Sequence, residues 1–304
     1  MALVTSDFLS GLMTNYRAIF HEAFIKATDA AEHKPLVLET TSKSAKEAYG
    51  WLGSLPALSE WKDTRKLHGM RVFDYTLENL NYEATIEVDR NTLEDDEYSM
   101  IQHRIRQMAQ RAIDHMGKLV FDLLDAGASE KAYDGIEFFD TTRVIGEGAN
   151  INNLLSGSYS GSADEIRNGV AAGVVAMRNF QDDRGVPMNL CPDTIVCSPT
   201  MEIPLKNALL PAVSGVTRAE AEIIKRIIVR PEIDADALDW YLLSTERMGL
   251  KPLIFQVRKT PEFVSVDRPD SHEVFMSRLL YYGIDWRGAV GFGDPRTAVK
   301  IVDS

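Results

Sequence analysis

The sequence predicts an α+β fold in which strands lie both before and after one long amphipathic helix. Alternating apolar and polar residues at 72–90 predict a pair of strands ahead of that helix. From about 95 to 126, apolar residues recur at helical spacing, and several short β-rich runs follow. No internal repeat is visible, so we expect the 304 residues to form one elaborated domain or two interleaved ones.

The long helix is the strongest local signal in the chain. Its predicted apolar face consists of Ile101, Ile105, Met108, Ala112, Met116, Leu119 and Leu123. Acidic residues at 94–97 suit the positive end of the helix dipole, and Gly127 follows the last apolar residue as a stop signal. About 30 residues that each rise ~1.5 Å predict a rod of roughly 45 Å, which is long for a globular enzyme.

The remaining elements are predicted from shorter patterns. Helices are expected at 7–28, 163–182 and 200–210. Strands are expected at 193–199, 223–231, 239–245, 252–259 and 262–267. The C-terminal segment from 272 is expected to form two or three further strands joined by Gly/Asp-Pro turns.

Charge and composition restrict the class of protein. The net charge is −12, and no basic cluster exceeds the short piece at 225–230, so wrapping of nucleic acid through its phosphates is not the expected role. No run approaches the ~18 apolar residues of a membrane helix, and the N-terminus lacks the basic region of a signal peptide. Cys191 and Cys197 lie six positions apart, which fits neither a zinc nor a redox motif. We therefore expect both cysteines to be small buried residues, and the protein to occupy a reducing, cytosolic compartment.

A search for catalytic motifs gives no candidate. The glycine-rich 288–295 lacks the helix and the acidic residue of a dinucleotide site. The pieces HEAFI and HEVFM lack the second histidine of a zinc protease, and SEWK lacks the partner motifs of a Ser-x-x-Lys enzyme. The acidic cluster at 93–99 lacks the glycine of a calcium loop. The sequence therefore predicts no catalytic, cofactor-binding or metal-binding residue, and no cofactor.

One stretch, YGWLGSLPALSEW at 49–61, combines large apolar side chains with helix and strand breakers. Gly50, Gly53 and Pro56 interrupt it, so it is predicted to be a loop. Its large apolar residues are Tyr49, Trp51, Leu52, Leu55, Leu58 and Trp61. Two indoles bury on the order of 400 Å², worth ~10 kcal/mol before ordering costs. They either fold back onto their own subunit or contact another one.

Several longer sequence segments resemble those of one known family. They are YGWLGSLPALSEW (49–61), LEDDEYS (93–99), AYDGIEFFD (132–140), KPLIFQVRKTPEF (251–263) and HEVFMSRLLYYGIDWRGAVGFG (272–293). Together with the order of the elements, they resemble the Mu-like prophage major head subunit, a tailed-phage major capsid protein with the Hong Kong 97-type fold. That family often has a histidine shortly after FFD, whereas Thr141, Thr142 and Arg143 follow here.

The resemblance implies a domain layout. Its parts are an N-terminal arm at 1–44, an extended loop at 45–75, a peripheral domain with the long spine helix at 76–145, an axial domain at 146–261, and C-terminal strands of the peripheral domain at 262–304. The extended loop would reach a neighbouring subunit through the six large apolar residues named above. Because a thin shell subunit has little interior of its own, burial between copies is physically reasonable.

The resemblance also implies the function and the partners. The chain would be a structural protein of the phage head and no enzyme, self-assembling into hexamers and pentamers of an icosahedral shell that encloses double-stranded DNA without reading its sequence. Scaffold and portal proteins, and a decoration protein, are implied partners, with no membrane. The location would be the virion capsid, assembled in the host bacterial cytoplasm. The alternatives are an encapsulin-like cargo compartment, or a cytosolic enzyme with a scattered site.

Overall fold

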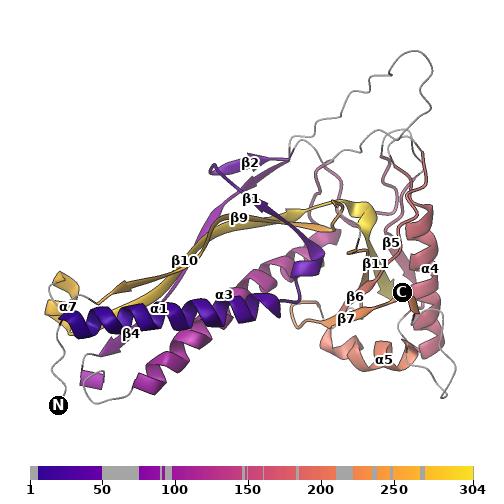
Figure 1. Ribbon diagram of the computed structural model, residues 1–304. Helices are drawn as coiled ribbons and strands as arrows, with labels where there is room; N and C mark the ends of the chain where they lie inside the picture. The colour runs from indigo at the N-terminus through magenta and orange to yellow at the C-terminus, as the bar shows by residue number, and fades with distance from the viewer. Residues whose placement is uncertain are drawn as a thin grey trace, which may run out of the picture.

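Figure 1 shows the computed structural model of the chain, which consists of an elongated arm joined to a more compact α/β part. The structure describes residues 6–49, 75–89, 91–92, 98–145, 148, 150–159, 161–182, 185–209, 222–234, 238–246, 249–267 and 271–303. Two sheets organise these residues, one of four strands in the arm and one of five strands in the compact part. A further two-stranded ribbon projects from the arm.

The four-stranded sheet runs the length of the arm. Its strands, in spatial order, are β1 (Val37–Thr41), β9 (Leu253–Val266), β10 (Leu279–Phe292) and β4 (Leu80–Asp89). β1 is parallel to β9, and the other pairs are antiparallel. The runs expected as two strands at 252–259 and 262–267 form the single strand β9. Its pairing with β10 shifts register around Arg287, which accommodates Pro261, a residue that cannot donate a ladder hydrogen bond.

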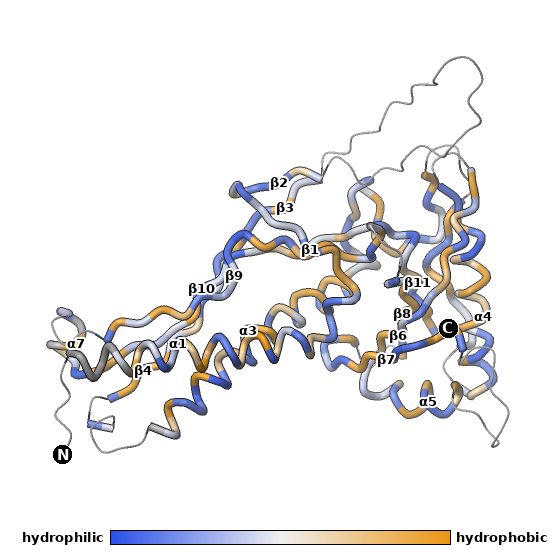
Figure 2. The backbone as a smooth tube through the Cα atoms, in the orientation of Figure 1, coloured by the Kyte–Doolittle hydropathy of each residue, from blue (hydrophilic) through white to orange (hydrophobic). Residues whose placement is uncertain are grey.

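Two long helices cover one face of this sheet. They are α1 (Ser6–Asp29) and α3 (Tyr98–Asp125), which confirm the helices predicted at 7–28 and, within the described residues, at 95–126. Figure 2 shows apolar and polar residues alternating along both helices, as amphipathic helices require. Their apolar stripes meet the sheet in a core that includes Tyr16, Phe20, Ile105 and Tyr282. The predicted acidic first turn at 94–97 lies outside the described residues.

The five-stranded sheet lies in the compact part. Its order is β5 (Leu154–Gly157), β11 (Ala298–Asp303), β8 (Trp240–Leu243), β6 (Thr194–Cys197) and β7 (Arg226–Val229). Helices α4 (Ala163–Asn179) and α5 (Pro199–Leu209) pack with it in a second core. A capping box formed by Ser162 and Glu165 starts α4. Burial of all four residues of β6, Cys197 included, confirms the predicted buried strand.

The two sheets meet in a shared core at the C-terminal half of α3. Phe121 and Leu124 of α3 contact residues of both sheets there, among them Phe255 and Tyr241. Short elements complete the structure. They are the 3-10 turns η1 (Lys34–Leu36), η2 (Ala126–Ala128) and η3 (Pro295–Thr297), the helix α7 (His272–Ser277), and the ribbon strands β2 (Lys46–Ala48) and β3 (Thr76–Glu78).

The two sheets combine strands from different ranges of the expected domain layout, which stays a prediction. β11, within the range 262–304, belongs to the five-stranded sheet. β9, which begins within the range 146–261, lies in the four-stranded sheet, and β1, within the range 1–44, lies beside it. These strands pair with partners far away in sequence, which local patterns do not report.

The start of the C-terminal segment differs from the strand predicted there. Residues expected to be a strand form the short helix α7, which the side chain of Ser271 caps by accepting from the backbone N–H of Val274. The helix ends at Arg278, which adopts a left-handed conformation with φ of 55°. Among the described residues, no helix has the length and apolar character needed to cross a membrane.

Candidate functional site

The ribbon of β2 and β3 is the base from which residues 50–74 leave and return. The backbone N–H of Tyr49 donates to the carbonyl of Tyr75 at 2.7 Å, which closes the ribbon at its outer end. The hydroxyl of Tyr49 donates to Oε1 of Gln256 on β9 at 2.6 Å and lies 2.8 Å from Oγ1 of Thr40. The start of the predicted loop is therefore tied to the four-stranded sheet.

A buried amide network continues this anchor. Nε2 of Gln256 donates to Oδ1 of Asn79 at 2.7 Å, and Nδ2 of Asn79 donates to Oγ of Ser42 at 2.8 Å. On the other side, the backbone N–H of Phe292 donates to the hydroxyl of Tyr75 at 2.9 Å. Burial raises the pKa of Tyr75, so this phenol stays neutral at physiological pH. Both ends of the loop are thus held by directional bonds to one rigid sheet.

Tyr49 packs within its own subunit. Its side chain is only 5% exposed and packs with Leu77 and Tyr133, so it anchors the base of the loop, while its predicted contact with a neighbouring subunit stays a prediction. The other five predicted contact residues are Trp51, Leu52, Leu55, Leu58 and Trp61, and they lie outside the described residues. Their contact with a neighbouring subunit stays a prediction.

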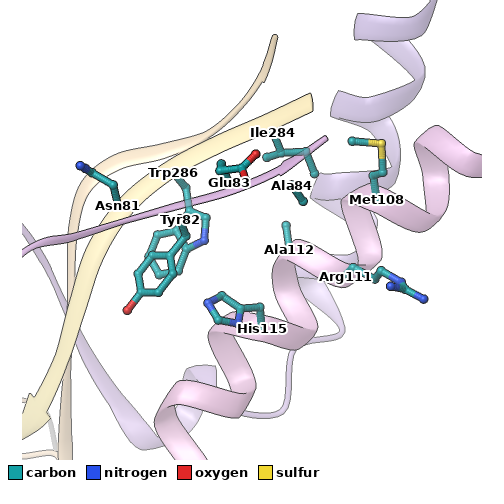
Figure 3. A pocket seen from close by; sticks show the side chains of 10 residues that line it. All are labelled: Asn81, Tyr82, Glu83, Ala84, Met108, Arg111, Ala112, His115, Ile284 and Trp286. Atoms are coloured by element: carbon teal, nitrogen blue, oxygen red, sulfur yellow. The ribbon is translucent and has the colours of Figure 1, made fainter. Parts of the chain in front are cut away.

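An apolar groove lies between α3 and the strands β4 and β10 (Figure 3). Its volume is about 400 Å³. Tyr82 and Trp286 stack with ring centroids 4.5 Å apart and form one wall, and the His115 ring meets Tyr82 edge-on at 4.8 Å. Ala84 and Ala112 face each other across the groove, and their small size leaves the space open.

The chemistry of this groove bears on the enzyme alternative. Its polar lining residues are Asn81, Glu83, Arg111 and His115, together with the Tyr82 hydroxyl. Burial, with a contribution from nearby Lys118, lowers the pKa of His115. Among the described residues that line it, there is no serine, cysteine or lysine that His115 could activate as a nucleophile. Among the described residues, no cluster of three or more His, Cys, Asp or Glu is arranged to hold a metal ion.

Single large apolar side chains are exposed on several elements. They include Met276 on α7, Ile203 on α5, Val175 on α4, and Leu80 on β4. Met276 and Ile203 are more than 60% exposed. Because these side chains lie singly on different elements, they do not by themselves define a binding surface.

Comparison with solved structures defines the class of protein. The procapsid protein of bacteriophage JBD30 aligns with a TM-score of 0.63 and 27% identity, over 99% of this chain and 77% of that one. The virus-like particle of Pyrococcus furiosus aligns with a TM-score of 0.57 over 95% of this chain and 98% of the other, at 12% identity, which shows the fold alone. The fold is thus that of the Hong Kong 97-type capsid proteins, which build homo-oligomeric shells.

Sequence comparison then identifies the family. The family model described as "Mu-like prophage major head subunit gpT" matches residues 9–166 and 221–303, so the chain belongs to this family. Two relatives are the Mu-like prophage FluMu major head subunit of Haemophilus influenzae (27% identity; 96% of this chain, 72% of the relative) and the major capsid protein of Escherichia phage Mu (25%; 98% and 75%).

The function follows from the family and the fold. The chain is a major capsid protein of the Mu-like phage type, a structural component of the virion head and not an enzyme. The enzyme and the encapsulin-like compartment considered from the sequence are therefore set aside. Sequence reasoning missed the residues that fix the loop base, namely Gln256, Asn79 and Tyr75. The available signal was Gln256 itself, an amide inside the otherwise apolar run PLIFQV.

Proposed function

We propose that copies of this chain assemble into hexamers and pentamers of an icosahedral shell through the loop at 50–74. The observation that carries the proposal is the rigid base of that loop. Tyr49 and Tyr75 fix its two ends to the sheet, so little freedom at the base is lost when the loop binds. A loop that carries two tryptophans and four leucines on such a base is suited to anchor in a neighbouring copy.

The contents and partners of the shell belong to the same proposal. The shell encloses double-stranded DNA without sequence-specific contacts, and the net charge of −12 supports weak adhesion between the wall and packed DNA. Scaffold and portal proteins direct assembly in the cytoplasm of the host bacterium, and a decoration protein binds the outside. The support for these partners is membership of the family, together with the resemblance described above.

The double variant Trp51→Ala, Trp61→Ala tests the role of the loop. We expect folded subunits that sediment mainly as small species, because the loop loses its two largest apolar side chains. A matched control is Ser54→Ala, Ser59→Ala, which changes the same loop without removing large apolar groups. Sedimentation velocity and negative-stain electron microscopy measure assembly, and circular dichroism measures the fold.

Two outcomes would contradict the proposal. Shell formation by the tryptophan variant at the level of the serine control would show that the indoles are not the anchor. Unfolding of the tryptophan variant as an isolated subunit would show that the indoles belong to the core of their own chain.

A further inference from the structure

The loop at 132–143, whose AYDGIEFFD motif has no role in the function described so far, lies where the two sheets meet. Its two phenylalanines contact different sheets. Phe138 stacks on Phe292 at the end of β10, with ring centroids 4.6 Å apart. Phe139 lies 5.5 Å from the ring of Tyr241 on β8. Both phenylalanines are at most 1% exposed, so the pair fills the space between the four-stranded and the five-stranded sheet.

The end of α3 holds this pair in place. The backbone N–H of Phe139 donates to the carbonyl of Gly127 at 2.8 Å. A Cβ atom at Gly127 would lie 2.9 Å from the Phe139 ring, so only glycine permits this approach. The loop is therefore packed against the long helix as well as against both sheets.

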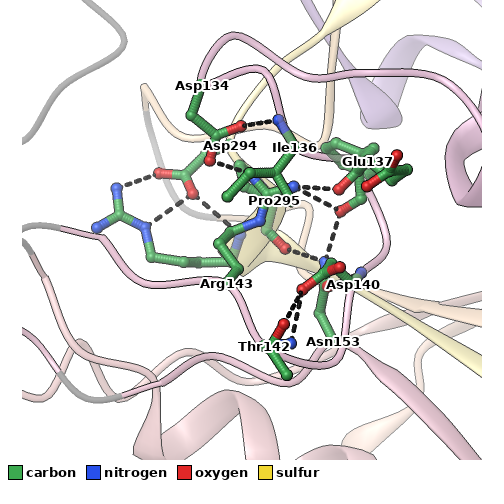
Figure 4. Close-up of polar contacts among 11 residues, drawn as sticks. Asp134, Ile136, Glu137, Asp140, Thr142, Arg143, Asn153, Asp294 and Pro295 are labelled. Atoms are coloured by element: carbon green, nitrogen blue, oxygen red, sulfur yellow. Dashed lines mark hydrogen bonds and ion pairs between the residues drawn. The ribbon is translucent and has the colours of Figure 1, made fainter.

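Arg143 fixes the backbone of the loop from inside (Figure 4). Its side chain is fully buried, and its guanidinium forms an ion pair with Asp134 and donates to the carbonyl oxygens of Glu137 and Phe138. Removal of one partner from a buried pair leaves an uncompensated charge, which is strongly unfavourable. Arg143 thus closes the loop on itself.

Asn153 joins this loop to the connection between the sheets. Its Nδ2 donates to the carbonyl of Phe138 at 2.9 Å and to that of Pro295 at 3.0 Å. Its Oδ1 accepts from the backbone N–H of Asp140 at 2.8 Å, and its carbonyl accepts from the N–H of Lys300 on β11 at 2.9 Å. One fully buried side chain therefore links the loop after α3 with the segment that runs from β10 to β11.

That connecting segment is itself stiff. Asp294 accepts from the backbone N–H of Arg296 at 3.0 Å, and its two carboxylate oxygens accept from Nε and a terminal nitrogen of the same arginine at 2.8 and 2.5 Å. Both side chains are at most 5% exposed. The short piece between the sheets is thus held in one conformation.

Resting on the shell assembly proposed above, we propose that residues 134–143, fastened by Arg143 and Asn153, form a wedge that sets the angle between the two sheets, and that this angle determines the curvature of the shell. Apolar contact alone is non-directional, whereas the hydrogen bonds of Asn153 define one relative position. A shell closes only when each contact repeats at the required angle, so a small change within the subunit alters the whole particle.

The variant Asn153→Ala tests the wedge, because it removes three side-chain hydrogen bonds, two to the loop and one to the connecting segment. We expect a folded subunit that still assembles, with a broader distribution of particle diameters and more open or tubular products. The control is Asn150→Ala, which removes one exposed hydrogen bond to Thr141 in the same segment and is expected to leave the particles unchanged. Electron microscopy of particles from equal amounts of protein gives the distributions.

A second variant keeps the test decisive if Asn153→Ala does not fold. Phe138→Leu retains an apolar side chain and removes the ring stack on Phe292 together with the edge contact to Phe139, so it is expected to fold and to broaden the diameters. If either Asn153→Ala or Phe138→Leu folds and gives closed particles with the wild-type diameter distribution, the proposed wedge is wrong.

Discussion

At the scale of single residues, Tyr49 shows how one hydroxyl organises the loop base. Its oxygen bonds to Gln256, whose other amide atom bonds to Asn79, so the three side chains form one buried polar network. Such networks are sensitive to the loss of any member, because the remaining partners are left without water or protein contacts.

The variant Tyr49→Phe is expected to lower the free energy of unfolding by about 1–3 kcal/mol, since Oε1 of Gln256 loses its donor. Urea denaturation followed by circular dichroism measures the change. Tyr281→Phe on the same sheet serves as the control, because its ring is only half-buried. Equal stability of both variants would show that the network contributes nothing.

His33 gives the subunit a pH dependence. The ring is 6% exposed, packs near Phe255, and lies so close to α3 that a Cβ on Gly117 would be 3.3 Å from its Nδ1. Burial, followed by the positive charges of Arg230 and Lys34, lowers its pKa to about 4. The unfolded chain, with an ordinary histidine pKa of about 6.5, therefore binds the proton first as the pH falls.

The stability contributed by neutral His33 is thus complete above about pH 6.5 and is lost as the pH falls towards 4. We expect the wild type to lose about 3 kcal/mol more than His33→Gln between pH 7 and pH 4. Urea titrations at several pH values measure this difference, with His21→Gln, at an exposed position of α1, as the control. Parallel pH profiles for wild type and His33→Gln would refute the assignment.

At the scale of elements, α4 shows how glycine sets helix–sheet distance. A Cβ at Gly173 would lie 2.2 Å from Cδ1 of Leu242 on β8, so the helix packs closer than alanine permits. On α1, by contrast, a Cβ at Gly11 would meet nothing within 4 Å. The same substitution therefore has opposite consequences in the two helices.

Gly173→Ala is expected to destabilise the subunit by about 1–2 kcal/mol, because overpacking exceeds the gain in helix propensity. Gly11→Ala, its matched control, is expected to stabilise by up to about 1 kcal/mol. Thermal unfolding followed by calorimetry measures both signs. A stabilising effect of Gly173→Ala would mean that Leu242 moves aside without cost.

The elements with strong periodicity were predictable from the sequence, whereas short or interrupted ones were not. The helix α3 is predicted by seven apolar positions on one face. The two strands expected at 252–259 and 262–267 form the single strand β9, because a register shift in its pairing with β10 accommodates Pro261. The short helix α7 is decided by the single cap at Ser271, which apolar periodicity does not detect.

At the scale of the whole molecule, sheet membership could not be derived from local patterns. β11 pairs with β5 and β8, and β1 pairs with β9, across long sequence separations. The capsid class was recognisable from the sequence only because several segments along the chain resemble those of the family. The wedge joins residues 134–143, 153 and 294–296, and the sequence shows no pattern that brings these segments together.

The elongated arm exposes some apolar side chains that other copies could cover. The arm consists of two layers, the four-stranded sheet and the helices that cover one of its faces. Apolar side chains such as Met276 and Leu80 are exposed along it. Contacts between many identical subunits can cover such positions, whereas a solitary subunit leaves them in water.

The most direct test of this account is electron microscopy of the purified protein, combined with its sedimentation. We expect ring-shaped capsomers, tubes or closed shells, with a sedimenting fraction that grows as the protein concentration rises. If the protein stays strictly monomeric even when it is concentrated, the claim that it self-assembles into a shell is contradicted.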